Sequence, residues 1–400
     1  MISKNIIYLF IIIILITGCR NKDDISPIQA EYFVKLFGSS FNDMANDIKQ
    51  TKDGGYIFIG TTTENVDKGT DIYFVKTDKY GNEQWSEFYG DSLNDVGESF
   101  QLTNDGGYIL LGTTTINSND KDIYLIKTNS QGKKEWENKI DNNNLNQEGK
   151  CVNLTNDGGY IIIGNTEIIK TPENVLNNFL IKTDENGDTI WTKIKGGAND
   201  AIGNYVIQNS SNEYLVVGAT KNFPLPNNYY NIIVNLYYDN GNIGTSLPFD
   251  KGNESICQNI QMIPNNEGYI IVGTTYNQDN QSKDIFVAKL GNDINNIIWE
   301  TTIGGNQEDV GQAICLTKDG GYAIIGSTKS QGSGASDIYL VKINNEGEEI
   351  FNRTYGSTGV DFGKAILQTE DEGYVIIGTT GFEGNDMITL IKTNPEGLLE

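Results

Sequence analysis

Acidic side chains recur at one position of a repeated segment, and they are the residues of this chain best placed to do chemistry. They stand just before the stretch that opens each repeat, at Asp43, Asp95, Asp200, Glu254, Asp309 and Asp361, with Gln147 in the remaining repeat. If the repeats surround an axis, the carboxylates converge near its mouth, where they could hold a hard cation such as calcium. Two of them could instead be the acid and the nucleophile of a glycoside hydrolase. A residue present in every repeat also suits a structural task, such as capping turn amides, so three interpretations stay open.

A second candidate site is a set of aromatic residues in loops that differ between repeats. Its members are Phe223, Tyr229, Tyr230 and Tyr276. Exposed aromatic rings among asparagines are typical of sugar-stacking platforms and of protein hot spots. The repeat that carries the first three has also lost a lysine, with Leu236 in its place. The aromatic set therefore indicates either a ligand-binding surface or drift in a tolerant repeat.

Composition excludes several classes of function. The chain has 400 residues and no histidine, so it lacks the commonest general base and zinc ligand. Its 29 basic and 53 acidic residues give a formal charge of −24, which disfavours nucleic acid as a partner. Cys151, Cys257 and Cys315 fall at different offsets of different repeats. We interpret them as small buried side chains rather than as a disulfide or a metal site.

The repeat itself is marked by a tyrosine followed four residues later by a glycine. The tyrosines are Tyr56, Tyr108, Tyr160, Tyr214, Tyr269, Tyr322 and Tyr374, with spacings of 52, 52, 54, 55, 53 and 52 residues. The glycines are Gly60, Gly112, Gly164, Gly218, Gly273, Gly326 and Gly378. A glycine at the end of an apolar β-rich run indicates a bulge or a close backbone approach. The spacing is that of a β-propeller blade.

Each repeat predicts four strands. In the first repeat they cover residues 45–51, 56–62, 71–78 and 84–90, and the turn at 53–55 contains the glycines that a tight hairpin needs. All four tryptophans of the chain, Trp85, Trp136, Trp191 and Trp299, occupy one position of the fourth strand, and Phe351 stands there in the sixth repeat. We expect these rings to pack between neighbouring blades.

The two ends of the repeat region complement each other. The seventh repeat stops at residues 394–400, before its own fourth strand, whereas residues 32–38 form a fourth strand without a preceding repeat. Phe33 precedes Tyr56 by 23 residues, the spacing between Trp85 and Tyr108. We therefore predict an all-β fold over residues 32–400, a seven-bladed propeller of four-stranded blades whose ring is closed by the N-terminal strand.

The segment between the third and fourth strands resembles a known family. KTDKYGNEQW (76–85), KTNSQGKKEW (127–136) and KTDENGDTIW (182–191) resemble the tryptophan-docking segment of quinoprotein-type propellers. The whole repeat resembles those of secreted bacterial β-propeller lipoproteins. This resemblance implies the fold and says little of function. Quinone-dependent members have an adjacent cysteine pair and usually eight blades, which are missing here, so we carry no cofactor over.

The N-terminus predicts export and lipidation. Residues 6–16 form an apolar run of the length of a signal peptide, and ITGC (16–19) resembles a bacterial lipobox. The resemblance implies a signal peptide at 1–18, a lipid on Cys19 and a polar tether over 19–31, although an ordinary cleaved signal or an uncleaved anchor would also fit. Lys22-Asp23-Asp24 resembles a surface-export signature, or is a plain solvated tether. We expect an outer-membrane lipoprotein, with display on the cell surface as an open alternative.

These observations lead to three hypotheses of function. The turns between first and second strands are near copies, whereas the loops between second and third strands diverge, and divergent loops on a rigid scaffold are where binding usually lies. The leading hypothesis is a non-catalytic, lipid-anchored envelope module that binds a protein or glycan through those loops. The alternatives are a polysaccharide hydrolase that uses the acidic residues, and a scaffold subunit of an envelope complex. We expect no cofactor other than, at most, calcium.

Overall fold

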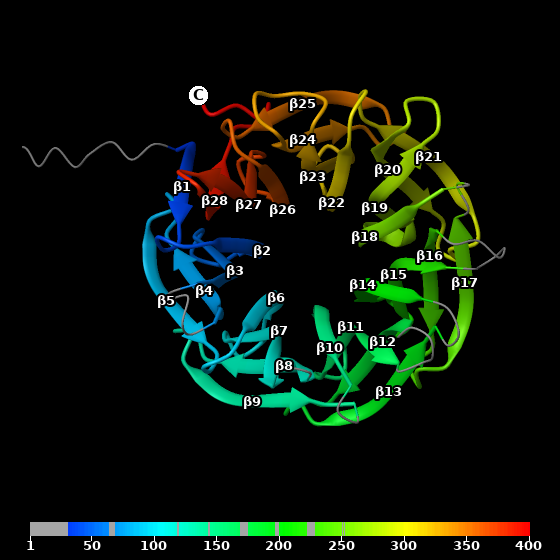
Figure 1. The fold of residues 1–400 in the computed structure, drawn as a ribbon. Coiled ribbons are helices and arrows are strands. Elements are labelled where there is room, and N and C mark those ends of the chain that lie inside the picture. The colour runs from blue at the N-terminus through cyan, green and yellow to red at the C-terminus, as the bar shows by residue number, and fades with distance from the viewer. Residues whose placement is uncertain are drawn as a thin grey trace, which may run out of the picture. The chain divides into compact units, whose positions relative to one another are not determined.

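The computed structural model describes residues 31–63, 69–117, 120–142, 145–168, 175–196, 200–221, 229–249, 251 and 253–400. Within them the strands form seven sheets of four antiparallel strands, and the sheets surround a central axis (Figure 1). We call the sheets blades 1 to 7, and the strands of each blade a to d from the axis outward. The prediction of an all-β, seven-bladed β-propeller is confirmed. Cys19 and the predicted signal peptide lie outside the described residues.

The strands have the following bounds. Strands a are β2 (Asp43–Gln50), β6 (Asp95–Leu102), β10 (Gln147–Leu154), β14 (Ala201–Gln208), β18 (Ser255–Ile263), β22 (Asp309–Leu316) and β26 (Asp361–Gln368). Strands b are β3 (Tyr56–Thr62), β7 (Tyr108–Asn117), β11 (Tyr160–Ile168), β15 (Tyr214–Lys221), β19 (Gly268–Asn277), β23 (Tyr322–Thr328) and β27 (Tyr374–Phe382). Strands c are β4 (Asp71–Thr77), β8 (Asp120–Thr128), β12 (Val175–Thr183), β16 (Tyr230–Tyr237), β20 (Ser282–Leu290), β24 (Asp337–Ile343) and β28 (Asn385–Lys392). Strands d are β5 (Glu83–Tyr89), β9 (Lys134–Ile140), β13 (Thr189–Lys195), β17 (Ile243–Phe249), β21 (Ile297–Ile303), β25 (Glu349–Tyr355) and β1 (Phe33–Phe37).

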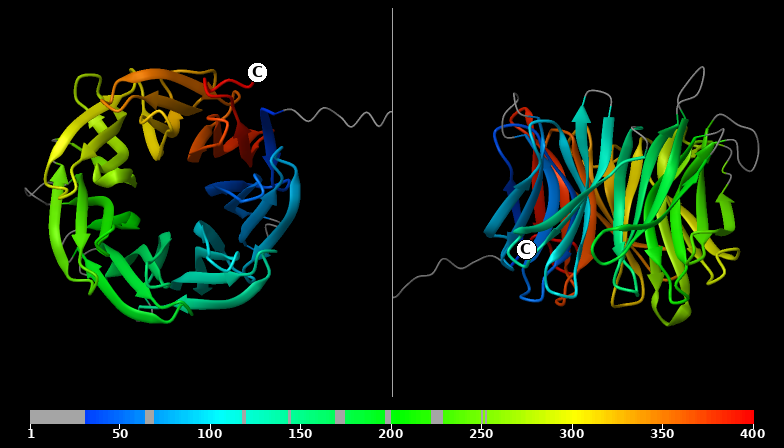
Figure 2. Two further views of the ribbon diagram at one scale, coloured as in Figure 1. Left: turned by 180° about the vertical axis from the view of Figure 1, so that it is seen from behind. Right: turned by 90° about the horizontal axis from the view of Figure 1, so that it is seen from below.

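Connections between strands lie on two opposite faces of the ring (Figure 2). Because neighbouring strands are antiparallel, the a–b and c–d turns share one face, which we call the turn face. The b–c loops and the d–a connections share the other, which we call the loop face. A short 3-10 turn, η1 (Pro264–Asn266), joins β18 to β19. No helix in the described part of the chain is long and apolar enough to cross a bilayer.

The N-terminal strand closes the ring. β1 pairs with β28 in antiparallel register from Phe33 opposite Lys392 to Phe37 opposite Ile388, so blade 7 has the order β1–β28–β27–β26. Figure 1 shows the two ends of the propeller side by side there. The predicted closure is thus confirmed, and it removes the open sheet edges that an unclosed array would carry.

The hydrophobic core lies between blades. Every residue of β3 is buried, and β4 is buried except for its first residue, because both faces of these strands are covered by neighbouring sheets. One cluster joins Ile59 and Phe74 of blade 1 to Phe100 and Leu110 of blade 2. β9 instead alternates between exposed and half-buried residues, as expected for the outermost strand of a blade.

An aromatic contact is repeated from blade to blade. The ring of Trp85 lies 6.3 Å from that of Tyr108 in the next blade, and the equivalent Trp191 lies 5.9 Å from Tyr214. The same contact crosses the closure, where Phe33 lies 6.4 Å from Tyr56. The tryptophans are therefore inter-blade packing residues, as the sequence predicts.

The glycine that follows each tyrosine marks a close backbone approach. A Cβ on Gly60 would lie 2.3 Å from the Met44 carbonyl oxygen, and a Cβ on Gly112 would lie 2.4 Å from that of Val96. The register of β2 against β3 shifts at the same place, between Ala45 and Asp47. Both features expected of this glycine, the close approach and the bulge, are present.

A buried lysine ties strand c to the a–b turn. Lys76 Nζ lies 2.9 Å from Asp53 Oδ2 and donates to the Thr77 carbonyl at 2.9 Å. The same pair recurs as Lys127 with Asp105, Lys182 with Asp157, Lys342 with Asp319 and Lys392 with Asp371. Blade 4 has lost both members together, with Leu236 for the lysine and Ser211 for the aspartate. Blade 5 keeps the lysine, Lys289, with Asn266 at the aspartate position and Glu267 3.9 Å away, so the lysine–aspartate pair is a feature of five of the seven blades.

Candidate functional site

The carboxylates of the predicted acidic ring cap the d–a turns. Asp43, Asp95, Asp309 and Asp361 are the first residues of their strands a and are buried. Each Oδ2 accepts a backbone N–H from the preceding turn, donated by Ser39 at 2.6 Å, Asp91 at 2.9 Å, Gly305 at 2.7 Å and Ser357 at 2.8 Å. The hydroxyl of Thr62 donates to Asp43, and that of Thr380 to Asp361. These contacts are those of a structural cap, which was one of the three interpretations of the sequence.

Asp200 and Glu254 do not occupy the same position as these caps. Strand pairing places Ala201 opposite Thr220 and Ser255 opposite Thr275, where the cap Asp43 stands opposite Thr62. Asp200 and Glu254 come one residue earlier in the chain. Asp200 Oδ2 lies 2.7 Å from Lys221 Nζ, and Glu254 is exposed. The acidic residues therefore do not form one ring of equivalent carboxylates.

The aromatic candidates lie on the loop face of blades 4 and 5. Tyr230, the first residue of β16, stacks under Lys221, whose Nζ is 4.6 Å from the ring centre, and partial burial raises the pKa of Tyr230. Tyr229 is half-buried. Tyr276 is also half-buried, and its backbone N–H donates to the Glu254 carbonyl at 2.9 Å. Phe223 lies outside the described residues. The structure thus assembles Tyr230, Lys221 and Asp200 in blade 4, with Tyr276 in the next blade.

Sequence reasoning missed a ring of polar side chains inside the channel. The register of every strand a against its strand b shifts by one residue, which makes one bulge residue per blade. The seven bulge residues are all polar, and we call them the bulge ring: Asn46, Glu98, Lys150, Asn204, Gln258, Gln312 and Lys364. They line a cavity of about 640 Å³. Bulges re-aim side chains and are frequent beside functional sites.

The cavity extends from the bulge ring toward the turn face, because its lining also includes Gln50 and Gln368 at the ends of their strands a. The sequence predicted binding at the other, loop face. A signal for the ring was present in the chain, since the residue three places after each cap position is polar in all seven repeats. That signal appears only when the repeats are aligned on the cap position rather than on the tyrosine.

The charges of the cavity are mostly paired. Lys150 Nζ lies 3.3 Å from Glu98 Oε1, and Lys49 Nζ lies 3.0 Å from Asp47 Oδ2. Lys364 forms no salt bridge with any residue that the structure describes, and its Nζ lies 5.4 Å from the centre of the Phe362 ring. Burial lowers the pKa of Lys364 and raises the pKa of Glu98. The cavity therefore has one unpaired cationic group among uncharged amides.

The two sides of the cavity differ in chemistry. Blades 4 and 5 contribute the amides of Asn204, Gln258 and Asn259 together with Tyr205, whose pKa is raised well above its ordinary value by burial. Blades 6 and 7 contribute a mainly apolar lining that includes Leu316 and further alanine, isoleucine and leucine residues. Amides offer donors and acceptors at once, so this arrangement suits a ligand with many hydroxyl groups and one apolar side.

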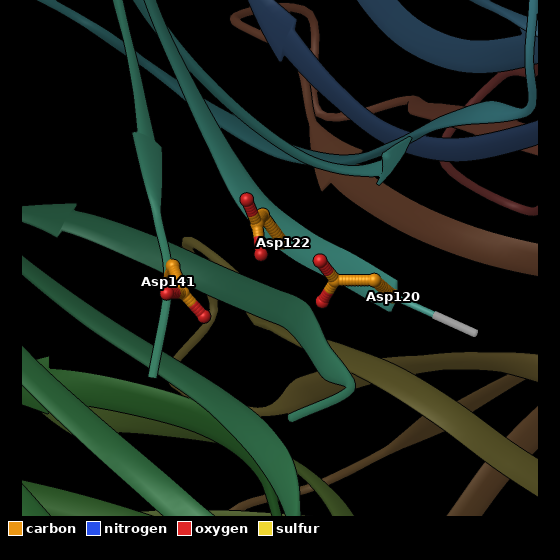
Figure 3. A group of neighbouring side chains, drawn as sticks. All are labelled: Asp120, Asp122 and Asp141. Carbon is orange, nitrogen blue, oxygen red and sulfur yellow. The ribbon is translucent and has the colours of Figure 1, made fainter. Parts of the chain in front are cut away.

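A separate acidic cluster lies on the loop face of blade 2. One carboxylate oxygen each of Asp120, Asp122 and Asp141 lies within 4.8 Å of the others (Figure 3). Burial raises the pKa of Asp122 to about 6, and the charges of Asp120 and Asp141 act in the same direction. This is the group of described residues that could hold a metal ion.

Comparison with known proteins shows the fold alone. No protein-family model matches the chain, and no curated protein matches it. Puromycin hydrolase is similar in structure, with a TM-score of 0.54 and 10% identity over 84% of this chain and 50% of that one. An acylaminoacyl peptidase in complex with Z-Gly-Gly-Phe-chloromethyl ketone has a TM-score of 0.50 and 10% identity over 90% of this chain and 52% of that one.

This chain spans about half the length of those two proteins. The β-propeller domain of the Trilobed protease from Pyrococcus furiosus is also similar, with a TM-score of 0.48 and 10% identity over 87% of this chain and 93% of that one. The chain is thus a β-propeller with propeller-containing structural neighbours. At such identity the neighbours' activities do not carry over.

Proposed function

We propose that this protein is a non-catalytic binding module that holds the end of a glycan in its central channel. The observation that carries the proposal is the bulge ring, in which all seven side chains are polar and four residue types, Asn, Gln, Glu and Lys, are represented. By contrast, the tyrosine that opens each strand b packs in a similar way throughout and is one residue type in all seven repeats. Varied donors and acceptors around one cavity suit an asymmetric ligand rich in hydroxyl groups.

The hydrolase alternative has less support. An acid and nucleophile pair needs two carboxyl groups that face the substrate. Asp43, Asp95, Asp309 and Asp361 are buried and accept turn amides instead. Glu98 does line the cavity, but it is paired with Lys150 at 3.3 Å. We therefore place binding ahead of catalysis.

The proposal is tested with a soluble form that begins at Pro27, screened by thermal shift against a panel of polysaccharides and oligosaccharides. We expect a ligand-dependent rise in Tm that is lost when Asn204 and Gln258 are both changed to alanine. Two lost hydrogen bonds correspond to a fall in affinity of about tenfold or more. The matched control changes Tyr229 and Tyr230, on the loop face of the same region, to alanine and should bind as the wild type does.

Three results would contradict this assignment. Loss of binding in the tyrosine control, with binding kept in the amide variant, would move the site to the loop face that the sequence predicted. Released oligosaccharide in the same samples would show catalysis. No shift across the panel would leave a protein partner or a scaffold role as the better explanation.

We further propose that a lipid on Cys19 holds the propeller at the bacterial envelope, on the outer membrane. The support is the apolar run of residues 6–16 followed by ITGC (16–19), and acyl chains anchor a protein stably without a membrane-spanning helix. Changing Cys19 to serine should shift the protein from the membrane fraction to the soluble fraction. A Cys19→Ser variant that stays in the membrane fraction would contradict lipid anchoring at this residue.

A further inference from the structure

Three aspartates of blade 2 meet at the loop face although they come from different parts of the blade. Asp120 and Asp122 lie at the start of β8, and Asp141 directly follows β9. A carboxylate oxygen of each lies within 4.8 Å of the others. Figure 3 shows the three side chains pointing toward a common region. Like charges at such distances repel each other, so the group needs a compensating interaction.

Two of the carboxylates carry buried oxygens without a hydrogen-bond partner. Asp122 is only 7% exposed. Its Oδ1 and the Oδ1 of Asp120 are buried, and neither accepts a hydrogen bond within the described residues. An unpaired buried carboxylate is costly, and buried polar atoms in native proteins nearly always have a partner. The orphaned oxygen of Asp122 therefore points to a missing ligand.

The equivalent aspartates of other blades do have partners. Asp284, at the same position of strand c in blade 5, accepts hydrogen bonds from Asn277 at 2.7 Å and from Asn280 at 3.2 Å. Asp337 of blade 6 accepts the backbone N–H of Ser333 at 3.0 Å. Asp122 Oδ1 therefore lacks the kind of partner that the equivalent aspartates of blades 5 and 6 have.

The third carboxylate is itself a departure from the repeat. Asp141 stands at the position where Gly90, Gly304 and Gly356 follow their own strands d, as the pairing of strands c and d shows. The cap aspartate of the next blade is replaced here by Gln147, whose Oε1 accepts the Asn142 N–H at 3.2 Å. Blade 2 has thus gained a carboxylate at the turn and has a neutral cap beside it.

Nearby basic groups pair elsewhere. Lys139 Nζ lies 3.6 Å from Asp91 Oδ2 and over the ring of Tyr124. Lys121 Nζ lies 3.2 Å from Glu148 Oε1. Neither Asp120 nor Asp122 forms a salt bridge with a lysine in the part of the chain that the structure describes. A positive charge from outside the chain would fit the cluster.

We propose that Asp120, Asp122 and Asp141 bind a calcium ion. Three carboxylates offer the hard oxygen ligands that calcium prefers, and the exposed side of Asp141 leaves room for water to complete six to eight ligands. Magnesium needs a nearly ideal octahedron at shorter distances, which a strand start and a turn are poorly suited to supply. The ion would tie the d–a turn of blade 2 to β8 on the loop face.

The test is isothermal titration of the chelator-treated protein with calcium chloride at physiological salt, with the calcium-induced change in Tm measured alongside. We expect one ion per chain with a dissociation constant on the order of 10⁻⁴ to 10⁻³ M, the range of calcium sites in extracellular modules. Magnesium chloride at the same concentrations should give a much smaller shift in Tm. Physiological salt suppresses loose cation binding to the acidic surface.

Three variants test whether calcium binds at these three aspartates. Asp141→Gly introduces the glycine that blades 1, 5 and 6 have at this turn and should fold while losing the calcium response. Asp122→Asn should lose it as well. Asp284→Asn, the same change at the equivalent position of blade 5, should keep the wild-type response. The proposal is overturned if the wild type shows no calcium binding, if Asp141→Gly keeps it, or if Asp284→Asn loses it equally.

Discussion

At the scale of single residues, the glycine of the c–d turn packs against the aromatic ring of the preceding blade in every blade except blade 5, where Ile294 takes its place. A Cβ on Gly132 would lie 2.7 Å from the Trp85 ring, and its φ of +74° lies in the left-handed region. Gly106 of the a–b turn has a φ of +85° but has nothing within 4 Å of a Cβ. A substitution at Gly106 therefore tests backbone strain alone, whereas a substitution at Gly132 tests backbone strain and steric crowding together.

We expect Gly132→Ala to lower the free energy of unfolding by more than Gly106→Ala does. Both variants lose about 1 kcal/mol for a left-handed alanine, and Gly132→Ala adds roughly 1–3 kcal/mol for the displaced indole ring. Urea unfolding of the soluble protein measures both values. Equal losses would show that the ring moves aside freely and that the glycine is needed for its φ alone.

The pairing of Lys76 with Asp53 predicts strong coupling between the two positions. Asp53→Ser leaves a buried ammonium with only the Thr77 carbonyl and Gln84 Oε1 as acceptors, which should cost about 1–3 kcal/mol. Adding Lys76→Leu, and so copying the residues that blade 4 has, should recover most of the loss because no buried charge remains. A double-mutant cycle in urea measures the coupling. Additive effects would contradict it.

The same pairs predict how stability responds to acid. Partial burial opposes ionisation of Asp53 and Asp105, but hydrogen bonds from threonine, lysine and backbone donors outweigh it and lower the pKa of each from 3.8 to about 2. A carboxyl group with a lowered folded-state pKa stabilises the fold above its unfolded pKa and loses that effect as pH falls. We therefore expect stability to drop between about pH 4 and pH 2. The Asp53→Ser/Lys76→Leu variant should show a shallower drop in urea midpoint across that window; an unchanged slope would contradict the assignment.

Individual site residues were the hardest part to predict from sequence. The sequence predicts Asp200 and Glu254 as members of the acidic ring because they fall one residue from the right spacing, and only strand pairing shows that Ala201 and Ser255 hold that position. The bulge ring was missed because a bulge turns a side chain toward the channel without changing the residue pattern. Asp141 was missed because its signal is the loss of a turn glycine, which is visible only when the ends of strands d are aligned.

At the scale of elements, prediction succeeded because each strand repeats one local pattern seven times. The tyrosine, the glycine four residues later and the aromatic residue of strand d each meet the same neighbours in nearly every blade, so their spacing directly encodes the blade. Even the closing strand was predictable, since Phe33 stands at the tryptophan spacing from Tyr56. The b–c loops follow no such pattern, and their conformation could not be predicted.

β1 differs from the other strands d in having no hairpin that links it to its neighbour. β1 is held in place only by its pairing with β28 and by side-chain packing, and Phe33→Ala removes the packing against Tyr56. We therefore expect this variant to expose β28 to hydrogen exchange. Phe351→Ala removes the equivalent ring from β25, 6.5 Å from Tyr374, but β25 stays tethered through its turn. Each change should cost about 3 kcal/mol or somewhat less. Equal amide protection of strands c in both variants would contradict this difference.

At the scale of the whole molecule, the ring depends on that one unlinked strand. A form that lacks residues 31–38 would present the edge of β28, a row of unpaired backbone groups that can pair with another chain. We expect it to form oligomers in light scattering under conditions in which the 31–400 form gives a single species. A peptide of residues 31–39 supplied in excess should reduce the oligomers. A truncated form that behaves as the longer one does would show that blade 7 needs no fourth strand.

The closure of blade 7 also sets the order in which the protein can be made. β1 is the first strand of the propeller to leave the ribosome and β28 is the last, so β1 waits for almost the whole chain before its partner exists. At ordinary rates of synthesis that wait lasts roughly 20 to 70 seconds. Blades 1 to 6 can form during this time, whereas the final pairing is a slow, non-local step. The folding intermediate most exposed to wrong pairing is therefore a nearly complete ring. In it the segment FVKLF (33–37) stays unpaired until β28 has been synthesised.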